Sequence, residues 1–79
     1  MWKEENNCLY KKFQFSDFIN AFSFMTRVAI LAEKADHHPT WKNTWNTLEI
    51  WLSTHDAGNI VTSKDRDLAK AIDDVEVLK

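Results

Sequence analysis

The first half of the chain carries an apolar stripe with helical spacing, and this stripe sets the expected architecture. Its members recur at steps of three and four residues: Phe18, Ala21, Phe22, Met25, Val28, Ala29 and Ala32. This spacing predicts an amphipathic helix of about five turns. We expect Ser16 as its N-cap, with Asp17 in the first turn. Because Pro39 pushes the preceding residue out of the helical region, the helix should end around residues 34–36.

Strand patterns lie on both sides of this helix. Residues 8–15 mix aromatic and polar side chains with partial alternation, which predicts a strand. Residues 2–4 are expected to pair with it as a short strand, with residues 5–7 as the turn between them. The stretch 41–53 ends in a clean two-residue alternation and is predicted to be β structure that folds back through a turn near residues 44–46.

A second capping motif predicts a closing helix. After a loop around Gly58, Thr62 and Asp65 have the spacing of a capping box, with Thr62 as the N-cap. The apolar residues that follow with helical spacing are Leu68, Ala71, Ile72 and Val75. The predicted order is β-β-α-β-β-α. The predicted fold class is α+β, a small antiparallel four-stranded sheet with helices packed on one face.

Length and composition exclude several classes of function. With 79 residues, the chain is expected to form a single domain that spans residues 1–79. The single cysteine, Cys8, excludes an internal disulfide and favours a reducing compartment, so we expect the cytoplasm, with the nucleus as the alternative. A net charge of −2 gives no basic field for nucleic-acid phosphates, and no apolar run approaches the ~20 residues of a membrane span. We therefore expect neither direct nucleic-acid binding nor membrane insertion.

Three histidines are candidates for acid-base chemistry at neutral pH. His37 and His38 follow the C-terminus of the predicted helix, and His55 lies where the long strand ends. If the helix packs on the sheet, the three imidazoles can surround one pocket. Other interpretations remain open: each histidine can be a surface residue or a helix-end cap, and a zinc site is disfavoured because neighbouring side chains in extended backbone diverge. The nearby carboxylates, which can equally be solvated helix ends and a cap, are Glu33, Asp36, Asp56 and Asp65.

The residues around these histidines resemble the pattern of the pterin-4a-carbinolamine dehydratases. That pattern is an acidic or polar residue, three residues, His-His-Pro, five or six residues, an aromatic, nine residues, His, and Asp some ten residues on. The matching positions here are Glu33, His37, His38, Pro39, Trp45, His55 and Asp65. The resemblance covers nearly the whole chain from Lys12 onward. Two departures are an N-terminal helix that members of the family usually carry and that is absent here, and a longer loop before Thr62.

This resemblance implies an enzyme. Its reaction would convert 4a-hydroxytetrahydrobiopterin to the quinonoid dihydropterin and water, as part of tetrahydrobiopterin recycling. The elimination needs a general acid and a general base, which two histidines can supply without a metal or cofactor. By resemblance His37, His38 and His55 are catalytic, with the acid and base unassigned and the C6 substituent of the pterin open. The implied substrate-binding residues are Glu33, Asp36, Pro39, Trp41, Ser53, Thr54, Asp56, Ala57 and Asp65.

A chain this short has a marginal core, which favours assembly with further copies. Phe24, Ile30 and Leu31 widen the apolar stripe of the predicted helix, and Trp51 is expected to point outward from the sheet. We expect a homodimer or homotetramer. By resemblance, dimers continue the sheet and tetramers pack helices together. The alternative to an enzyme is a non-catalytic dimerisation cofactor of a homeodomain transcription factor, a partner that no feature of the sequence supports.

Overall fold

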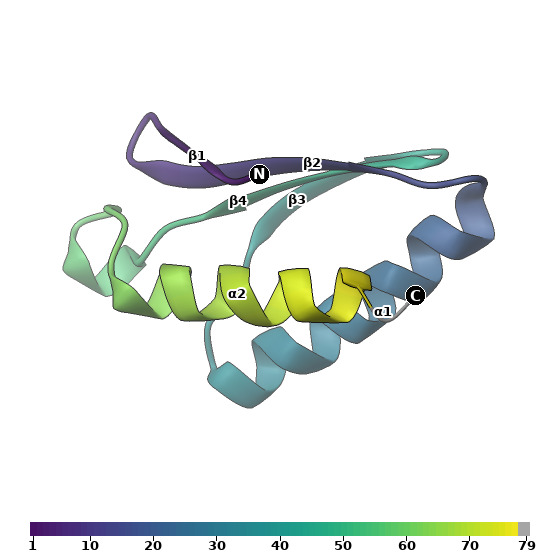
Figure 1. The fold of residues 1–79 in the computed structure, drawn as a ribbon. Helices are drawn as coiled ribbons and strands as arrows, with labels where there is room; N and C mark the ends of the chain where they lie inside the picture. Colours follow the sequence, from purple (N-terminus) through teal and green to yellow (C-terminus); the bar gives the residue numbers. More distant parts are fainter. Residues whose placement is uncertain (78–79) are drawn as a thin grey trace.

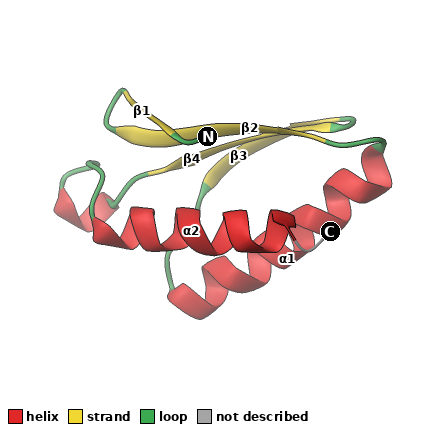
Figure 2. Cartoon of the chain, in the orientation of Figure 1, coloured by secondary structure: helices red, strands yellow, loops and turns green. Residues whose placement is uncertain are grey.

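One sheet, with two helices on one of its faces, makes up the structure, a computed structural model that describes residues 1–77 (Figures 1 and 2). In chain order the elements are β1 (Lys3–Glu5), β2 (Cys8–Gln14), α1 (Phe18–Ala35), β3 (Thr40–Thr44), β4 (Thr47–Leu52), a short 3-10 helix (His55–Ala57) and α2 (Ser63–Val77). The predicted α+β class and the order β-β-α-β-β-α are confirmed.

The sheet is antiparallel throughout, with the strand order β1-β2-β4-β3. The two central strands pair so that Leu9 lies opposite Leu52 and Phe13 lies opposite Leu48. All four of these side chains are buried. Since side chains alternate between the faces of a sheet, this register turns one apolar face toward both helices.

The first hairpin differs by one residue from the sequence prediction. Its short strand is Lys3–Glu5 rather than residues 2–4, and the turn consists of Asn6 and Asn7 alone. Both asparagines have positive φ angles, 51° and 62°. A two-residue hairpin turn favours this backbone, and Asn tolerates it better than most residues. The asparagine pair therefore fixes the register of the hairpin.

Asp17, not the predicted Ser16, caps the N-terminus of α1. The Asp17 backbone is extended, and its carboxylate accepts a hydrogen bond of 2.8 Å from the backbone N–H of Asn20. The Ser16 hydroxyl instead accepts from the side chain of Asn20. A carboxylate in this position also interacts favourably with the helix dipole. The C-terminus matches the prediction, because Asp36 ends the helix in the left-handed conformation, three residues before Pro39.

The core lies between the inner face of the sheet and both helices, and the α1 face that enters it differs from the predicted one. Phe24, predicted at the edge of the stripe, is 1% exposed and its ring lies 5.0 Å from that of Phe13. Phe18 and Phe22, predicted inside, are 44% and 54% exposed. Phe24 follows Ala21 by three residues, so the two share the buried side, whereas Phe18 and Phe22 lie on its flank.

Polar contacts hold α2 against the sheet at half-buried positions. The Lys11 ammonium on β2 lies 2.9 Å from Asp73 and 3.3 Å from Glu76, and the Trp2 indole donates to Asp73 at 2.9 Å. Burial alone would lower the pKa of Lys11, but the hydrogen bonds to the two carboxylates outweigh it and raise this pKa. These contacts tie α2 to β2 and to the residue before β1.

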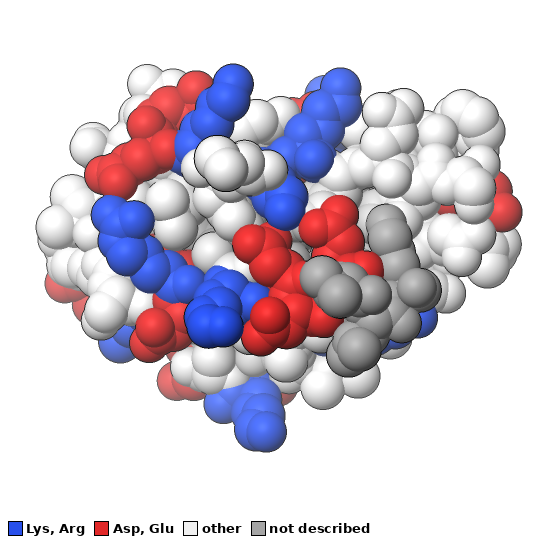
Figure 3. Space-filling model, viewed as in Figure 1, with Lys and Arg blue, Asp and Glu red and all other residues white. Residues whose placement is uncertain are grey.

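Charged side chains of both signs share the face of the molecule seen in Figure 3. Lysine and arginine side chains lie beside acidic ones there, so neither sign of charge covers this face alone. Within residues 1–77, no helix combines the length and apolar character that crossing a membrane requires.

Candidate active site

The end of α1, the end of β4 and the start of α2 meet around one cavity. Its volume is about 260 Å³. Its walls hold all three histidines, His37, His38 and His55, together with Asp36, Ser53, Thr54, Asp56 and Lys64. The structure therefore brings together the three imidazoles that were predicted to surround one pocket.

Local backbone geometry explains this convergence. The left-handed backbone of Asp36 turns the chain out of α1, and the N–H of His37 bonds back to the helix at 3.0 Å. At the end of β4, Thr54 pairs with Ile60 across the loop, with a 2.8 Å bond from its N–H. This bridge holds the short helix that begins at His55 close to the end of the sheet.

His37 is held by a carboxylate from the other helix. Its Nε2 lies 2.6 Å from Oδ1 of Asp65, whose side chain is completely buried at the start of α2. The His37 side chain is 11% exposed, so its ring has little freedom to turn. Asp65 was predicted to contact substrate, but its place behind His37 gives it no surface in the cavity.

A chain of hydrogen bonds holds Asp65 in turn. Its Oδ2 accepts from the Thr54 hydroxyl at 2.7 Å and from the N–H of Thr62 at 2.8 Å. The two threonine hydroxyls lie 2.6 Å apart, and because Thr54 gives its proton to Asp65, Thr62 is the donor in that bond. The Thr62–Asp65 contact also realises one half of the predicted capping box.

The same bonds assign the proton on His37. Burial alone would raise the pKa of Asp65, but the bonds from His37, Thr62 and Thr54 outweigh it and lower this pKa. An ionised carboxylate can only accept hydrogen bonds, so Nε2 of His37 must be the donor. In a neutral His37 ring, the lone pair is therefore on Nδ1.

His38 and His55 have more open surroundings. Nε2 of His38 lies 2.8 Å from Oε1 of Glu33, and this side chain is 58% exposed. Nδ1 of His55 lies 3.2 Å from Oδ1 of Asn59, also at the surface. His37 and His38 thus bind carboxylates on different helices, in line with the divergence expected for adjacent residues.

Several predicted site residues lie outside this cavity. Glu33, Pro39 and Trp41 line a separate cavity of about 440 Å³, on which His38 also borders. They lie there because Glu33 belongs to the last turn of α1, while Pro39 and Trp41 lead into and along the edge strand β3. Ala57, at the exposed end of the short 3-10 helix, is not part of the three-histidine cavity either.

Lys64 is a wall residue that was not among the predicted site residues. It lies in the first turn of α2, directly before Asp65. The capping box in the sequence marks where the helix begins, but it does not indicate which residues of the first turn face the cavity. Lys64 adds a cation to a cavity that also contains the carboxylates of Asp36 and Asp56.

This arrangement suits proton transfer between histidines and a polar ligand. One ring is fixed with a defined tautomer and two rings are open to solvent. The described residues contain no group of three His, Cys, Asp or Glu side chains placed to hold a metal ion.

Comparison with known proteins decides the family. The sequence model described as pterin 4 alpha carbinolamine dehydratase matches residues 1–75. The chain belongs to this family. A Rhodopseudomonas palustris (strain HaA2) protein named as a pterin-4-alpha-carbinolamine dehydratase is 53% identical over 73 residues, which cover 90% of this chain and 71% of the relative. A Prochlorococcus marinus (strain NATL2A) protein with the same name is 51% identical over 72 residues, covering 91% and 75%.

Solved structures share the dehydratase fold. A transcriptional coactivator/pterin dehydratase from Brucella melitensis superposes with a TM-score of 0.88 at 37% identity, covering 94% of this chain and 80% of that one. A pterin dehydratase-like protein described as a RuBisCO assembly factor in the alpha-carboxysome superposes with a TM-score of 0.73 at 22% identity, covering 92% and 83%. The second likeness concerns the fold alone.

Proposed function

We propose that this dehydratase-family chain is a hydro-lyase that removes water from a 4a-hydroxytetrahydropterin. The observation that carries the proposal is the single cavity lined by His37, His38 and His55. Imidazoles are the side chains whose ordinary pKa lets them both donate and accept protons at neutral pH. Membership of the family supports the substrate class.

The elimination breaks the C4a–O and N5–H bonds and forms an N5=C4a double bond. A general acid protonates the departing hydroxyl, which leaves as water, and a general base takes the N5 proton. We assign the base to His37, since Asp65 binds its Nε2–H and leaves the Nδ1 lone pair for the substrate. The acid is then His38 or His55, whose exposed rings regain protons from solvent.

The remaining cavity residues suit the polar edge of the pterin. Its amino-pyrimidinone edge presents N–H donors, and Asp36 and Asp56 offer carboxylate acceptors. Ser53 adds a hydroxyl to the same wall. The Thr54 hydroxyl is already committed to Asp65, so its role is to position that carboxylate. The product is the quinonoid dihydropterin, and the role we propose is the recycling of a tetrahydropterin, in the cytoplasm.

The direct test is dehydration of freshly generated 4a-carbinolamine, followed by absorbance with and without the protein. His37→Ala and His55→Ala should each lower the catalysed rate by ~10²–10⁴. The double variant should cost less than the product of the two single losses, because both groups act in one step. Lys70→Ala, on the exposed side of α2, is the matched control and should retain the wild-type rate.

The pH profile separates the roles. A base must be unprotonated, so the wild-type rate should rise with pH along an acidic limb, and this limb should be lost in His37→Ala. Wild-type rates in both His37→Ala and His55→Ala would refute acid-base catalysis. Loss of circular dichroism in both variants would instead mean that the histidines support the fold.

A second candidate function is that of an interaction module, which one observation favours. The outer side of α1 leaves Phe18, Ile19, Phe22 and Ile30 exposed, with Ile19 at 71%. We propose that this surface packs against further copies to form a dimer or tetramer. A transcription-factor partner would use the same kind of surface. A chain that forms such complexes but gives no dehydration above the spontaneous rate would be a non-catalytic module.

A further inference from the structure

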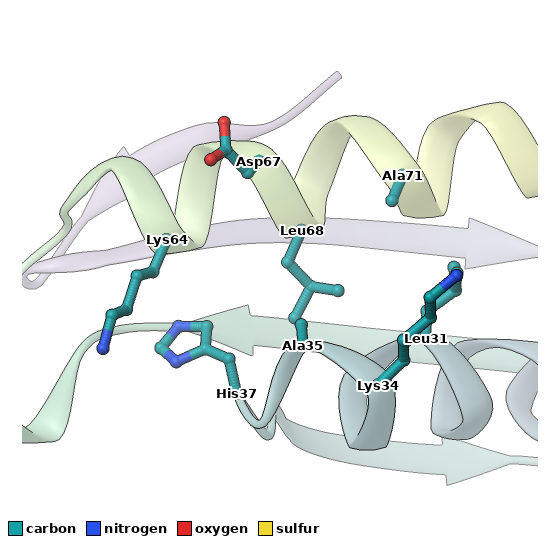
Figure 4. A pocket seen from close by; sticks show the side chains of 8 residues that line it. All are labelled: Leu31, Lys34, Ala35, His37, Lys64, Asp67, Leu68 and Ala71. Carbon is teal, nitrogen blue, oxygen red and sulfur yellow. The ribbon is translucent and has the colours of Figure 1, made fainter.

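Another cavity lies between α1 and α2, next to the candidate active site (Figure 4). Its volume is about 430 Å³. Leu31 and Ala35 of α1 face Leu68 and Ala71 of α2 across it, and Leu68 points toward Ala35. Its surface is therefore mainly aliphatic.

Two lysines give this cavity a positive character. Lys34 and Lys64 come from opposite helices, and Figure 4 shows them toward opposite ends of the cavity. Neither forms an ion pair with another side chain in residues 1–77. The carboxylate of Asp67, also on the wall, points away from α1. An anion at the end of an apolar group would thus find two unpaired cations here.

This aliphatic cavity adjoins the three-histidine cavity. His37 and Lys64 belong to the walls of both. Sites that enclose drug-sized ligands measure roughly 300–1,000 Å³, so the 260 Å³ of the three-histidine cavity suits a bicyclic ring with little else. A longer substituent on that ring would have to continue elsewhere, and the cavity beyond His37 is adjacent.

We propose that the cavity between the helices binds the C6 substituent of the pterin, and that it selects an apolar stem with a carboxylate at its end. Reduced folates, in which an aromatic ring joins the pterin to carboxylates, carry a C6 substituent of this chemistry. The stem lies against Leu31, Leu68 and Ala71, and the carboxylate pairs with Lys34. This inference rests on the proposed function, because it assumes that a pterin ring occupies the three-histidine cavity.

Two stable dihydropterins test the preference by isothermal titration calorimetry: 6-methyl-7,8-dihydropterin and 7,8-dihydrofolate. The wild-type protein should bind dihydrofolate at least about tenfold more tightly, because its stem buries additional apolar surface. Lys34→Glu should weaken dihydrofolate binding by about fivefold and leave the methyl compound unchanged. Ala71→Phe, which fills the cavity, should remove the preference. Lys70→Glu is the charge-matched control, since it changes a lysine of α2 outside the cavity.

Equal affinity for the two compounds in the wild-type protein overturns the inference, as does a Lys34→Glu effect of the same size on both. If Ala71→Phe instead lowers the molecular mass measured by light scattering, the cavity is a contact between copies, which also overturns it. Catalysed dehydration of a 6-methyl carbinolamine without a preference for dihydrofolate would refute this inference alone. Absence of both dehydration and binding would refute the proposed function as well.

Discussion

Replacing Thr54 by valine tests whether the hydroxyl chain behind His37 matters. The change keeps the shape of the side chain and removes two hydrogen bonds, of 2.6 Å to Thr62 and 2.7 Å to Asp65. Thr54 is 6% exposed and Asp65 is fully buried, so water cannot replace the lost donor. A hydrogen bond to a charged group contributes about 1.5–3 kcal/mol, and the free energy of unfolding should fall by that amount. Domains of ordinary stability withstand such a loss, so the variant should fold.

The effect on catalysis follows from the geometry. Without Thr54, Oδ2 of Asp65 retains only the N–H of Thr62, and the carboxylate can rotate away from His37. We expect kcat to fall by roughly 10-fold with little change in KM, the scale at which residues behind a first contact act.

Thr54→Ser is the matched control because it keeps the hydroxyl and loses only a methyl group. It should restore kcat to within about threefold of wild type, a tolerance well below the loss expected for valine. Urea unfolding and carbinolamine dehydration measure the two effects on the same samples. The reasoning is wrong if valine matches wild type in both assays, or if serine is as impaired as valine.

Three further predictions concern the acid range, metals and assembly. The pKa of Asp65 is lower in the folded protein, so its contribution to stability is present above the unfolded pKa of about 3.9 and is lost as pH falls through the folded pKa. Asp65→Asn should therefore show a smaller decrease of the unfolding free energy between pH 5 and pH 2, measured by urea titration. Prolonged dialysis against a chelator should leave dehydration and circular dichroism unchanged, and tightly bound stoichiometric zinc whose removal stops turnover would contradict the acid-base site. Light scattering should give at least a dimer at micromolar concentration, with Phe22→Glu shifting the mass toward the monomer; a monomeric wild type would exclude assembly through α1.

Periodicity was sufficient to predict the elements because the chain has few breakers, and those few act strongly. Pro39 predicted the end of α1, and the Thr62–Asp65 spacing predicted the start of α2. The predicted N-cap of α1 was wrong by one residue. Both Ser16 and Asp17 are residue types that cap helices well, and only the path of the chain out of β2 decides between them.

The buried face of α1 could not be predicted for a similar reason. Apolar residues cover more than half of the helix circumference, so spacing alone leaves its rotation open. Packing against the sheet selects Phe24, whose ring meets Phe13 and Phe15, and leaves Phe18 and Phe22 outside. The rotation of α1 about its own axis is therefore set by tertiary packing and cannot be predicted from a local sequence pattern.

For the candidate site too, part of the arrangement could be predicted from the sequence and part depends on tertiary packing. The histidines were placed together because they end adjacent elements, which topology alone implies. Glu33 and Trp41 are close to His38 in sequence but lie around its other side, and sequence distance cannot distinguish the two sides of a ring. Lys64 was missed because its position depends on how the first turn of α2 faces α1.

The hydrogen bond between Trp2 and Asp73 joins residues 71 positions apart. Contacts of such sequence separation form late, because the loop between them must close first. During synthesis the part of the inner face that α2 covers therefore remains exposed until α2 has left the ribosome. Asp65 arrives with the same helix, so His37 receives its partner only at the step that closes the core. A nascent chain that stalls before α2 should be both inactive and a substrate for chaperones. The active site is therefore complete only when the whole domain has folded.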